Sequence, residues 1–302
     1  MTDILVIGAG PAGLTAALYA RRADKSVLVL EKGAFGGQIT YSPQVENIPG
    51  FTRISGNEFA DHLVEQVLAQ GADMEMAEVT AVRDDGDRKT VITTDGEYTA
   101  RAVIVAAGAR HRLLDLPRET DFIGEGISFC AVCDGAFYRG QRVAVVGGGN
   151  SALQEALLLA DLAAEVTVVQ NLDFLTGEQK LQEQLAARDN VTVITGAVVD
   201  GLLGDTALTS IRIRKTADGM VRELPLDGLF VAIGLVPQNE PFSAVLTLDE
   251  RGYADADERC LTGTPGVFVA GDCRKKAIRQ VTTAAADGAI AALAACDYVD
   301  SL

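Results

Sequence analysis

The residues most able to do chemistry are Cys130 and Cys133, two cysteines separated by two other residues. A zinc site would need two further ligands at a matching spacing, and the remaining cysteines and histidines are scattered along the chain. A pair with this spacing suits reversible dithiol chemistry, in which one thiolate attacks an external disulfide and the other resolves the mixed disulfide. Asp134 adjoins the pair, and it either exchanges the proton that this chemistry requires or serves only as a turn residue.

A glycine-rich turn near the N-terminus offers a second kind of chemistry. Gly8, Gly10 and Gly13 fit the G-x-G-x-x-G pattern between a predicted strand and a predicted helix. Such glycines permit a tight turn, the close approach of a pyrophosphate, and close packing of the helix on the strand. Glu31 closes the following strand, where a carboxylate can accept hydrogen bonds from both ribose hydroxyls. The pattern predicts an adenine dinucleotide site, with a purely structural turn as the alternative.

A third group of residues favours a flavin as that dinucleotide. Gly271 and Asp272 follow a short apolar run and precede another predicted helix. Asp272 is placed to bind a ribityl hydroxyl, while the N-terminus of the helix favours phosphate. Alone, this pair is more typical of an ordinary turn. Together with Arg279, Gln280 and the first glycine turn, it indicates a flavin dinucleotide.

The elements that must position these residues alternate along the chain. Apolar runs predict buried strands at residues 3–7, 26–30, 102–105, 142–146, 165–169, 191–194, 229–233 and 267–269. Helical patterns cover residues 11–23, 56–70, 151–164 and 282–295. Residues 143–152 echo residues 4–13, a second strand, glycine turn and helix. We therefore predict an α/β fold with two Rossmann-like, doubly wound, three-layer nucleotide-binding domains.

The composition of the 302 residues is that of a globular protein. Hydrophobic residues make up 48% and charged residues 23%, which excludes a disordered chain and a coiled coil. The net charge of −16 predicts repulsion from nucleic acid and from anionic membranes. No secretion signal or membrane-spanning run is visible, and the cysteine count is odd, so we expect a cytoplasmic protein.

Together these motifs resemble the low-molecular-weight thioredoxin reductase family, and the resemblance runs the length of the chain. The matching segments are residues 8–13, 36–38, 46–47, 130–135, 147–152, 232–234, 271–272 and 279–280. The cysteine motif just before the second glycine turn is highly specific.

The resemblance implies an FAD-binding domain made of residues 1–112 and 240–302, with a pyridine-nucleotide-like domain, residues 113–239, inserted in it. It also implies noncovalent FAD, a homodimer, and a thioredoxin-like protein as substrate. The scattered cysteines and histidines, separately, predict no metal site. By resemblance, Cys133 would face the flavin, Cys130 would attack the partner disulfide, and Asp134 would be the acid/base. The resemblance assigns FAD binding to Gly8, Gly10, Pro11, Ala12, Gly13, Glu31, Lys32, Gly37, Gln38, Asn47, Val79, Ala107, Gly108, Gly271, Asp272, Arg279, Gln280 and Val281.

The second glycine turn departs from the family where NADPH would bind. The family places a His-Arg-Arg cluster and a further arginine after the second strand of this unit, to hold the adenosine 2′-phosphate. Here that strand leads into Gln170, and no arginine stands between Arg142 and Arg188. Each missing charged hydrogen bond costs roughly 1.5–3 kcal/mol, so losing two predicts ~100-fold weaker NADPH binding. The acid that NADH prefers is also missing, unless Asp173 curls back to replace it.

The missing cluster leaves the electron donor open. Some relatives without it use reduced ferredoxin, so the leading interpretation is a flavin-dependent thioredoxin-disulfide reductase whose donor is not NADPH. Arg274, Lys275, Lys276 and Arg279 form either a basic patch for an acidic ferredoxin or an ordinary solvated face. The alternatives are an NAD(P)H-dependent reductase with atypical nucleotide binding, a dithiol oxidase that passes electrons to oxygen, and a non-catalytic redox sensor.

Overall fold

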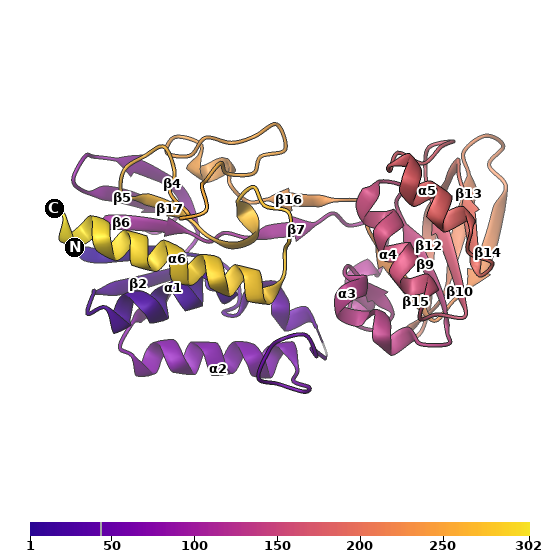
Figure 1. The fold of residues 1–302 in the computed structure, drawn as a ribbon, viewed down its shortest axis with the longest axis horizontal. Helices are drawn as coiled ribbons and strands as arrows, with labels where there is room; N and C mark the ends of the chain where they lie inside the picture. The colour runs from indigo at the N-terminus through magenta and orange to yellow at the C-terminus, as the bar shows by residue number, and fades with distance from the viewer. Residues whose placement is uncertain (43) are drawn as a thin grey trace. The chain divides into compact units, whose positions relative to one another are not determined.

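A computed structural model describes residues 1–42 and 44–302, which divide into two compact units (Figure 1). The first unit joins Met1–Arg110 to Val236–Leu302, and the second is His111–Leu235. The chain therefore leaves the first unit, forms the second as an insertion, and returns. The two crossing segments, β7 (Ala109–His111) and β16 (Leu235–Pro237), pair as a two-stranded sheet.

The first unit is built on a sheet whose strands next to the first glycine turn are parallel. The strands of this sheet are β1 (Thr2–Ile7), β2 (Val27–Glu31), β3 (Asp73–Met76), β4 (Val79–Asp84), β5 (Lys89–Thr93), β6 (Glu97–Val105) and β17 (Val267–Val269). β1 pairs in parallel with β2 and β6, and β17 pairs in parallel with β6. β4, β5 and the start of β6 form an antiparallel meander. The carboxyl ends of the parallel strands share one edge, where nucleotides bind in such sheets.

Three helices belong to the first unit: α1 (Pro11–Arg22), α2 (Gly56–Ala69) and α6 (Val281–Asp300). α1 begins at Pro11, whose missing N–H is not needed in the first helical turn. α6 packs directly against α1. The two helices are so close at Gly288 that a β-carbon added there would lie only 2.1 Å from the Ala12 carbonyl oxygen. This packing brings the turn after β17 next to the turn after β1.

The second unit is also built on a parallel sheet, but a small antiparallel sheet covers one of its faces. Its parallel strands are β8 (Ile127–Ser128), β9 (Arg142–Val146), β10 (Glu165–Val169), β11 (Val191–Ile194) and β15 (Gly228–Val231), in the order β11-β10-β9-β15-β8. An apolar core joins one face of this sheet to α4 (Asn150–Ala160) and α5 (Gln179–Ala186). A second core joins it to the antiparallel sheet of β12 (Ala197–Gly204), β13 (Leu208–Lys215) and β14 (Val221–Pro225). The unit is thus three layers thick.

Short helices occupy several connections. They are α3 (Ala131–Asp134) and the 3-10 helices η1 (Gly37–Tyr41), η2 (Glu119–Phe122), η3 (Gly135–Tyr138), η4 (Glu240–Phe242) and η5 (Gly271–Cys273). α3 and η3 precede β9, and η5 follows β17 directly. The connections therefore hold both the cysteine pair and the Gly-Asp turn.

The predicted α/β fold is confirmed, and every predicted strand and helix is present: β9, β10, β11 and β17 have the predicted bounds, and the other predicted elements have shifted ends. The strand predicted at residues 229–233 ends at Val231, and the helix predicted at residues 151–164 ends at Ala160. Sequence reasoning missed α5 and the strands β3, β4, β5, β7, β8, β12, β13, β14 and β16. Of these, α5, β3 and β14 are largely exposed and lack a continuous apolar run. No helix among the described residues is long and apolar enough to cross a membrane.

Candidate functional site

Cys130 and Cys133 form a disulfide at the start of α3. Their Cα atoms lie 5.3 Å apart, and Cys130 occupies the N-cap position of the helix with an extended backbone. The Cys133 amide donates a hydrogen bond to Cys130 Sγ at 3.2 Å. Both cysteines are half-buried, whereas Val132 between them is 59% exposed. The pair is therefore neither sealed in the core nor fully solvated.

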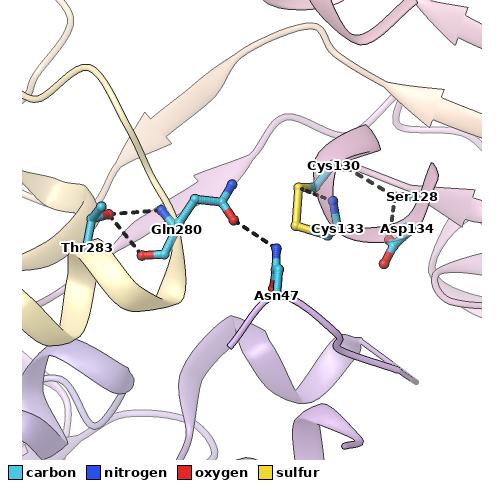
Figure 2. Close-up of a disulfide and its surroundings, with 7 residues drawn as sticks. All are labelled: Asn47, Ser128, Cys130, Cys133, Asp134, Gln280 and Thr283. Carbon is cyan, nitrogen blue, oxygen red and sulfur yellow. Dashed lines mark hydrogen bonds between the residues drawn. A yellow bond between two sulfur atoms is a disulfide. The ribbon is translucent and has the colours of Figure 1, made fainter. Parts of the chain in front are cut away.

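A short hydrogen-bond chain holds Asp134 next to the disulfide (Figure 2). Ser128 Oγ donates to Asp134 Oδ2 at 2.6 Å, and the Cys130 amide donates to Ser128 Oγ at 3.1 Å. A serine hydroxyl has one proton, so its bond to the carboxylate fixes the direction of the chain. The backbone of the first cysteine is thereby connected to the carboxyl group.

Burial alters the proton affinity of this carboxyl. Asp134 Oδ1 is buried and has no hydrogen-bond partner. Burial raises the pKa of Asp134 above its ordinary value, and the hydrogen bond from Ser128 opposes the rise. A carboxyl with a raised pKa is better suited to accept and return a proton near neutral pH.

Sequence reasoning missed Ser128 and Glu155, which belong to no motif. Glu155 Oε2 on α4 is buried without a hydrogen-bond partner. Burial, and then the charge of Asp134, raises the pKa of Glu155 to about 8. The available signal was a glutamate on the apolar face of a helix, since a carboxyl is seldom buried there without a reason.

The first glycine turn has the geometry that its pattern predicts. Gly8 has a φ of 103°, and a β-carbon there would lie 2.4 Å from the Ala106 carbonyl oxygen. A β-carbon on Gly13 would lie 1.8 Å from the Gly8 carbonyl oxygen. Gly10 differs, because the nearest atom to an added β-carbon is Gly37 Cα at 3.9 Å. The space beside Gly10, at the N-terminus of α1, therefore fits a pyrophosphate.

Glu31 ends β2 and faces the same turn. Its Oε2 accepts a hydrogen bond from the Ala9 amide at 2.8 Å, and its Oε1 accepts one from the Gly33 amide at 2.8 Å. An ionised carboxylate offers about four acceptor positions, so about two remain for ribose hydroxyls. The geometry fits the predicted dinucleotide contact.

Asp272 lies at the same edge of the sheet, in η5. A β-carbon on Gly271 would lie 2.8 Å from Ala12 Cβ, so this turn packs onto α1. Asp272 Oδ1 is buried without a hydrogen-bond partner, and burial raises the pKa of the carboxyl. A hydroxyl of a bound ligand would satisfy this buried oxygen. The first unit therefore fits FAD, because Gly10 leaves space beside the start of α1, Glu31 keeps free acceptor positions, and Asp272 has a buried oxygen without a hydrogen-bond partner.

The start of α6 joins two more of the residues predicted to bind the cofactor. Asn47 Nδ2 donates to Gln280 Oε1 at 3.2 Å, and Gln280 and Thr283 form a capping box (Figure 2). Gln38 in η1 donates to the Ala109 carbonyl oxygen. The other predicted residues also belong to the first unit: Lys32 follows β2, Gly37 begins η1, Val79 begins β4, Ala107 and Gly108 follow β6, Arg279 follows η5, and Val281 begins α6.

The basic run is not the surface patch considered from the sequence. Arg274 is 9% exposed, and its guanidinium binds both carboxylate oxygens of Asp287, at 3.0 and 3.2 Å. Lys276 Nζ lies 2.9 Å from Asp287 Oδ2. Arg279 is half-buried and donates to backbone carbonyls. Only Lys275 of the four is exposed, because Asp287 on α6 holds two of the cations in the interior.

The second glycine turn repeats the backbone of the first. Gly8 donates its amide to the Leu30 carbonyl oxygen at 2.8 Å, and Gly147 donates to the Val169 carbonyl oxygen at 2.9 Å. These matching bonds place Gln170 where the first unit has its carboxylate. The two turns can therefore be compared residue by residue.

The side chains around the second turn are different. Gln170 is 5% exposed and covers Gly148, whose added β-carbon would lie 2.5 Å from the glutamine amide nitrogen. The amide of Gln170 is bonded within its own loop. Asp173, considered as a substitute acid, lies beside Gly196 instead, with Oδ1 2.5 Å from an added β-carbon there. A neutral side chain thus stands where the first unit has the carboxylate of Glu31.

Comparison with known proteins gives one consistent result. Residues 2–288 match the family model described as pyridine nucleotide-disulphide oxidoreductase. The chain is 41% identical to the thioredoxin reductase of Listeria innocua, over 99% of this chain and 94% of that one. It is 39% identical to the thioredoxin reductase of Bacillus subtilis, over 99% and 95%. The crystal structure of thioredoxin reductase from Streptococcus pyogenes matches with a TM-score of 0.95 and 40% identity, over 100% and 99%.

Proposed function

This chain belongs to the pyridine nucleotide-disulphide oxidoreductase family, among its low-molecular-weight thioredoxin reductases, and we propose that it reduces a thioredoxin-like protein with electrons from a donor other than NADPH. The family consists of FAD-binding flavoenzymes. The observation that carries the proposal is the Cys130–Cys133 disulfide with Asp134 held beside it. We include in the proposal the homodimer that the resemblance implies, which sedimentation of the purified protein would test.

The proposed exchange conserves electrons and protons. The Cys130 thiolate attacks the partner disulfide, which forms a mixed disulfide and releases one partner sulfur. The Cys133 thiolate then attacks Cys130 Sγ, which restores the internal disulfide and releases the second partner sulfur. Two protons pass from the two cysteine thiols to the two partner sulfurs. Asp134 takes and returns these protons, since its raised pKa favours both steps.

The first unit supplies the cofactor site. When bound, FAD supplies the two electrons that reduce the Cys130–Cys133 disulfide. Glu31 binds the ribose hydroxyls, the backbone at Gly10 admits the pyrophosphate, and Asp272 accepts from a ribityl hydroxyl.

The second unit supports a donor that is not a pyridine nucleotide. Gln170 offers no carboxylate to a ribose, and Lys180 is the only cation between Arg142 and Arg188 to meet a 2′-phosphate. We propose reduced ferredoxin, two molecules of which supply two electrons without needing a dinucleotide site. The choice of electron donor, unlike the proposed thioredoxin reduction, rests on the second glycine turn alone, because the buried basic run offers a ferredoxin only Lys275.

Cysteine variants test the disulfide chemistry. Cys130→Ser and Cys133→Ser should each abolish steady-state reduction of a thioredoxin disulfide while the bound flavin content stays unchanged. Cys296→Ser, a buried cysteine in α6, is the matched control and should keep its turnover. Full turnover in either active-pair variant would contradict the assignment.

A donor series tests the electron source. Thioredoxin reduction should proceed with chemically reduced ferredoxin and should be slow with NADPH or NADH at micromolar concentrations. Fast turnover with either nucleotide would establish an NAD(P)H-dependent reductase with atypical binding. Rapid oxygen consumption with a small dithiol would establish a dithiol oxidase instead.

A further inference from the structure

Glu155 lies on the face of α4 that packs against the cysteine segment. The spacing of Glu155, Leu158, Leu159 and Leu162 places all four on one side of a helical path. A β-carbon added to Gly135 would lie 3.2–3.5 Å from side-chain carbons of the three leucines. Because Gly135 directly follows Asp134, the face that carries Glu155 covers the residue next to the acid/base carboxyl.

Both carboxyl groups in this contact have a buried oxygen without a hydrogen-bond partner. Among the described residues, four buried side-chain atoms lack a partner, and two of them are Asp134 Oδ1 and Glu155 Oε2. Each group alone is costly to bury ionised. Two like charges in one apolar place are costlier still, so a retained proton relieves the repulsion.

We propose that Glu155 is a positioning residue of the dithiol site, which keeps a proton beside Asp134 and thereby keeps Asp134 ionised as the base for the cysteine thiols. This proposal rests on the proposed role of Asp134. In each exchange step, a thiol gives its proton to Asp134, which returns it to the departing partner sulfur. Glu155 keeps its own proton throughout, so no proton is gained or lost.

The charges around Glu155 determine how pH should affect thiolate formation at the two cysteines. Below its pKa of about 8, raised by burial and then by Asp134, Glu155 is neutral and adds no charge beside Asp134. Above it, a second negative charge opposes thiolate formation at the nearby sulfurs. Tyr138 in η3 also faces this place, and burial, then Asp134 and Glu125, raises its pKa to about 12, so it stays neutral.

Alkylation of the reduced holoenzyme tests the proposal. The dithiothreitol-reduced protein is treated with iodoacetamide from mildly acid to alkaline pH, and modification of Cys130 and Cys133 is followed by peptide mass spectrometry. In the unmodified protein, the rate profile should show a second titration near the pKa of Glu155. Glu155→Gln should remove this step and react roughly 3- to 10-fold faster at alkaline pH, as for a thiol pKa shift of about half to one unit.

Two further variants complete the design. Glu165→Gln removes an exposed carboxyl of the same unit and should leave the profile unchanged. Glu155→Met is a second neutral replacement and should give the same profile as Glu155→Gln, with folding checked by flavin absorbance. Profiles of both Glu155 variants that match the unmodified protein would overturn the proposal. The assay uses neither thioredoxin nor an electron donor, so its failure is distinct from a failure of thioredoxin turnover.

Discussion

The two glycine turns have nearly the same backbone, yet the residue beside each turn, at the end of the next strand, is different. In the first unit, Glu31 accepts the Ala9 amide and keeps acceptor positions for a ribose. In the second, Gln170 occupies the equivalent place, lies over Gly148 and is bonded within its own loop. The glycines permit a nucleotide to approach, whereas the charge at the end of the second strand selects it. A shared glycine pattern is therefore insufficient to assign a second cofactor.

The cluster around Asp287 and the pair Asp134 and Glu155 show two different uses of a buried carboxyl. Asp287 in the first unit is matched by Arg274 and Lys276. Asp134 and Glu155 in the second each keep an unpartnered oxygen. A paired carboxylate stabilises structure, whereas an unpartnered one with a raised pKa is available for proton transfer.

Adding a side chain at the first or the second glycine turn should have the largest effect on flavin content, and the two variants should differ strongly. Gly10 and Gly149 both have extended backbones, and neither added β-carbon meets an atom closer than 3.8 Å. Gly10→Val should fold but purify without flavin, because the side chain blocks the pyrophosphate. Gly149→Val should keep its flavin and its ferredoxin-driven turnover. Loss of ferredoxin-driven turnover in Gly149→Val with flavin intact would contradict this comparison, because it would show that turnover needs the open second turn.

Removing the paired carboxyl should destabilise the protein strongly. Asp287→Asn leaves two buried cations without their partner, which should lower the free energy of unfolding by about 3–5 kcal/mol. Burial raises the pKa of Asp287, but the bonds from Arg274 and Lys276 outweigh it and lower the net pKa. This stability is therefore present above the ordinary aspartate pKa of 3.8 and lost as pH falls through the lower folded value.

Urea unfolding measures that loss, with a matched control. Asp300→Asn removes a carboxyl that is 66% exposed, and it should change the unfolding free energy by about 0–1 kcal/mol. Equal midpoints for Asp287→Asn and Asp300→Asn would contradict a stabilising role for the buried cluster.

Exchanging the residues at the ends of the second strands should have a moderate effect on FAD affinity. Glu31→Gln removes a charged acceptor, so FAD affinity should fall by about 10- to 100-fold, equivalent to roughly 1.5–3 kcal/mol. Gln170→Glu is the reciprocal change and should leave FAD affinity unaltered. Equilibrium dialysis of the apoprotein against FAD measures both, and equal affinities for the two variants would contradict the comparison.

The exposed lysine of the basic run should contribute least. Lys275→Ala should change the rate with reduced ferredoxin by less than about fivefold, because one exposed ion pair contributes about 0–1 kcal/mol. A much larger loss would mean that this single charge dominates donor docking.

Local patterns predicted much of the fold and the principal motifs. The buried parallel strands show as apolar runs, and the glycine turn is visible because an added β-carbon at Gly13 would meet the Gly8 carbonyl oxygen of the same turn, 1.8 Å away. The burial of Arg274 and Lys276 could not be predicted from the sequence, because their partner Asp287 lies on a helix that only the packing of the fold brings beside them. Likewise, no spacing relates Glu155 to the cysteines, since only the packing of α4 on the cysteine segment brings it there.

Anaerobic stopped-flow absorbance of the bound flavin tests the central claim most directly. The oxidised enzyme is mixed in turn with NADPH, NADH and chemically reduced ferredoxin, and the loss of the flavin band is followed in a single turnover. The two glycine turns predict rapid bleaching by ferredoxin and little bleaching by either nucleotide. Rapid bleaching by micromolar NADPH would contradict the account.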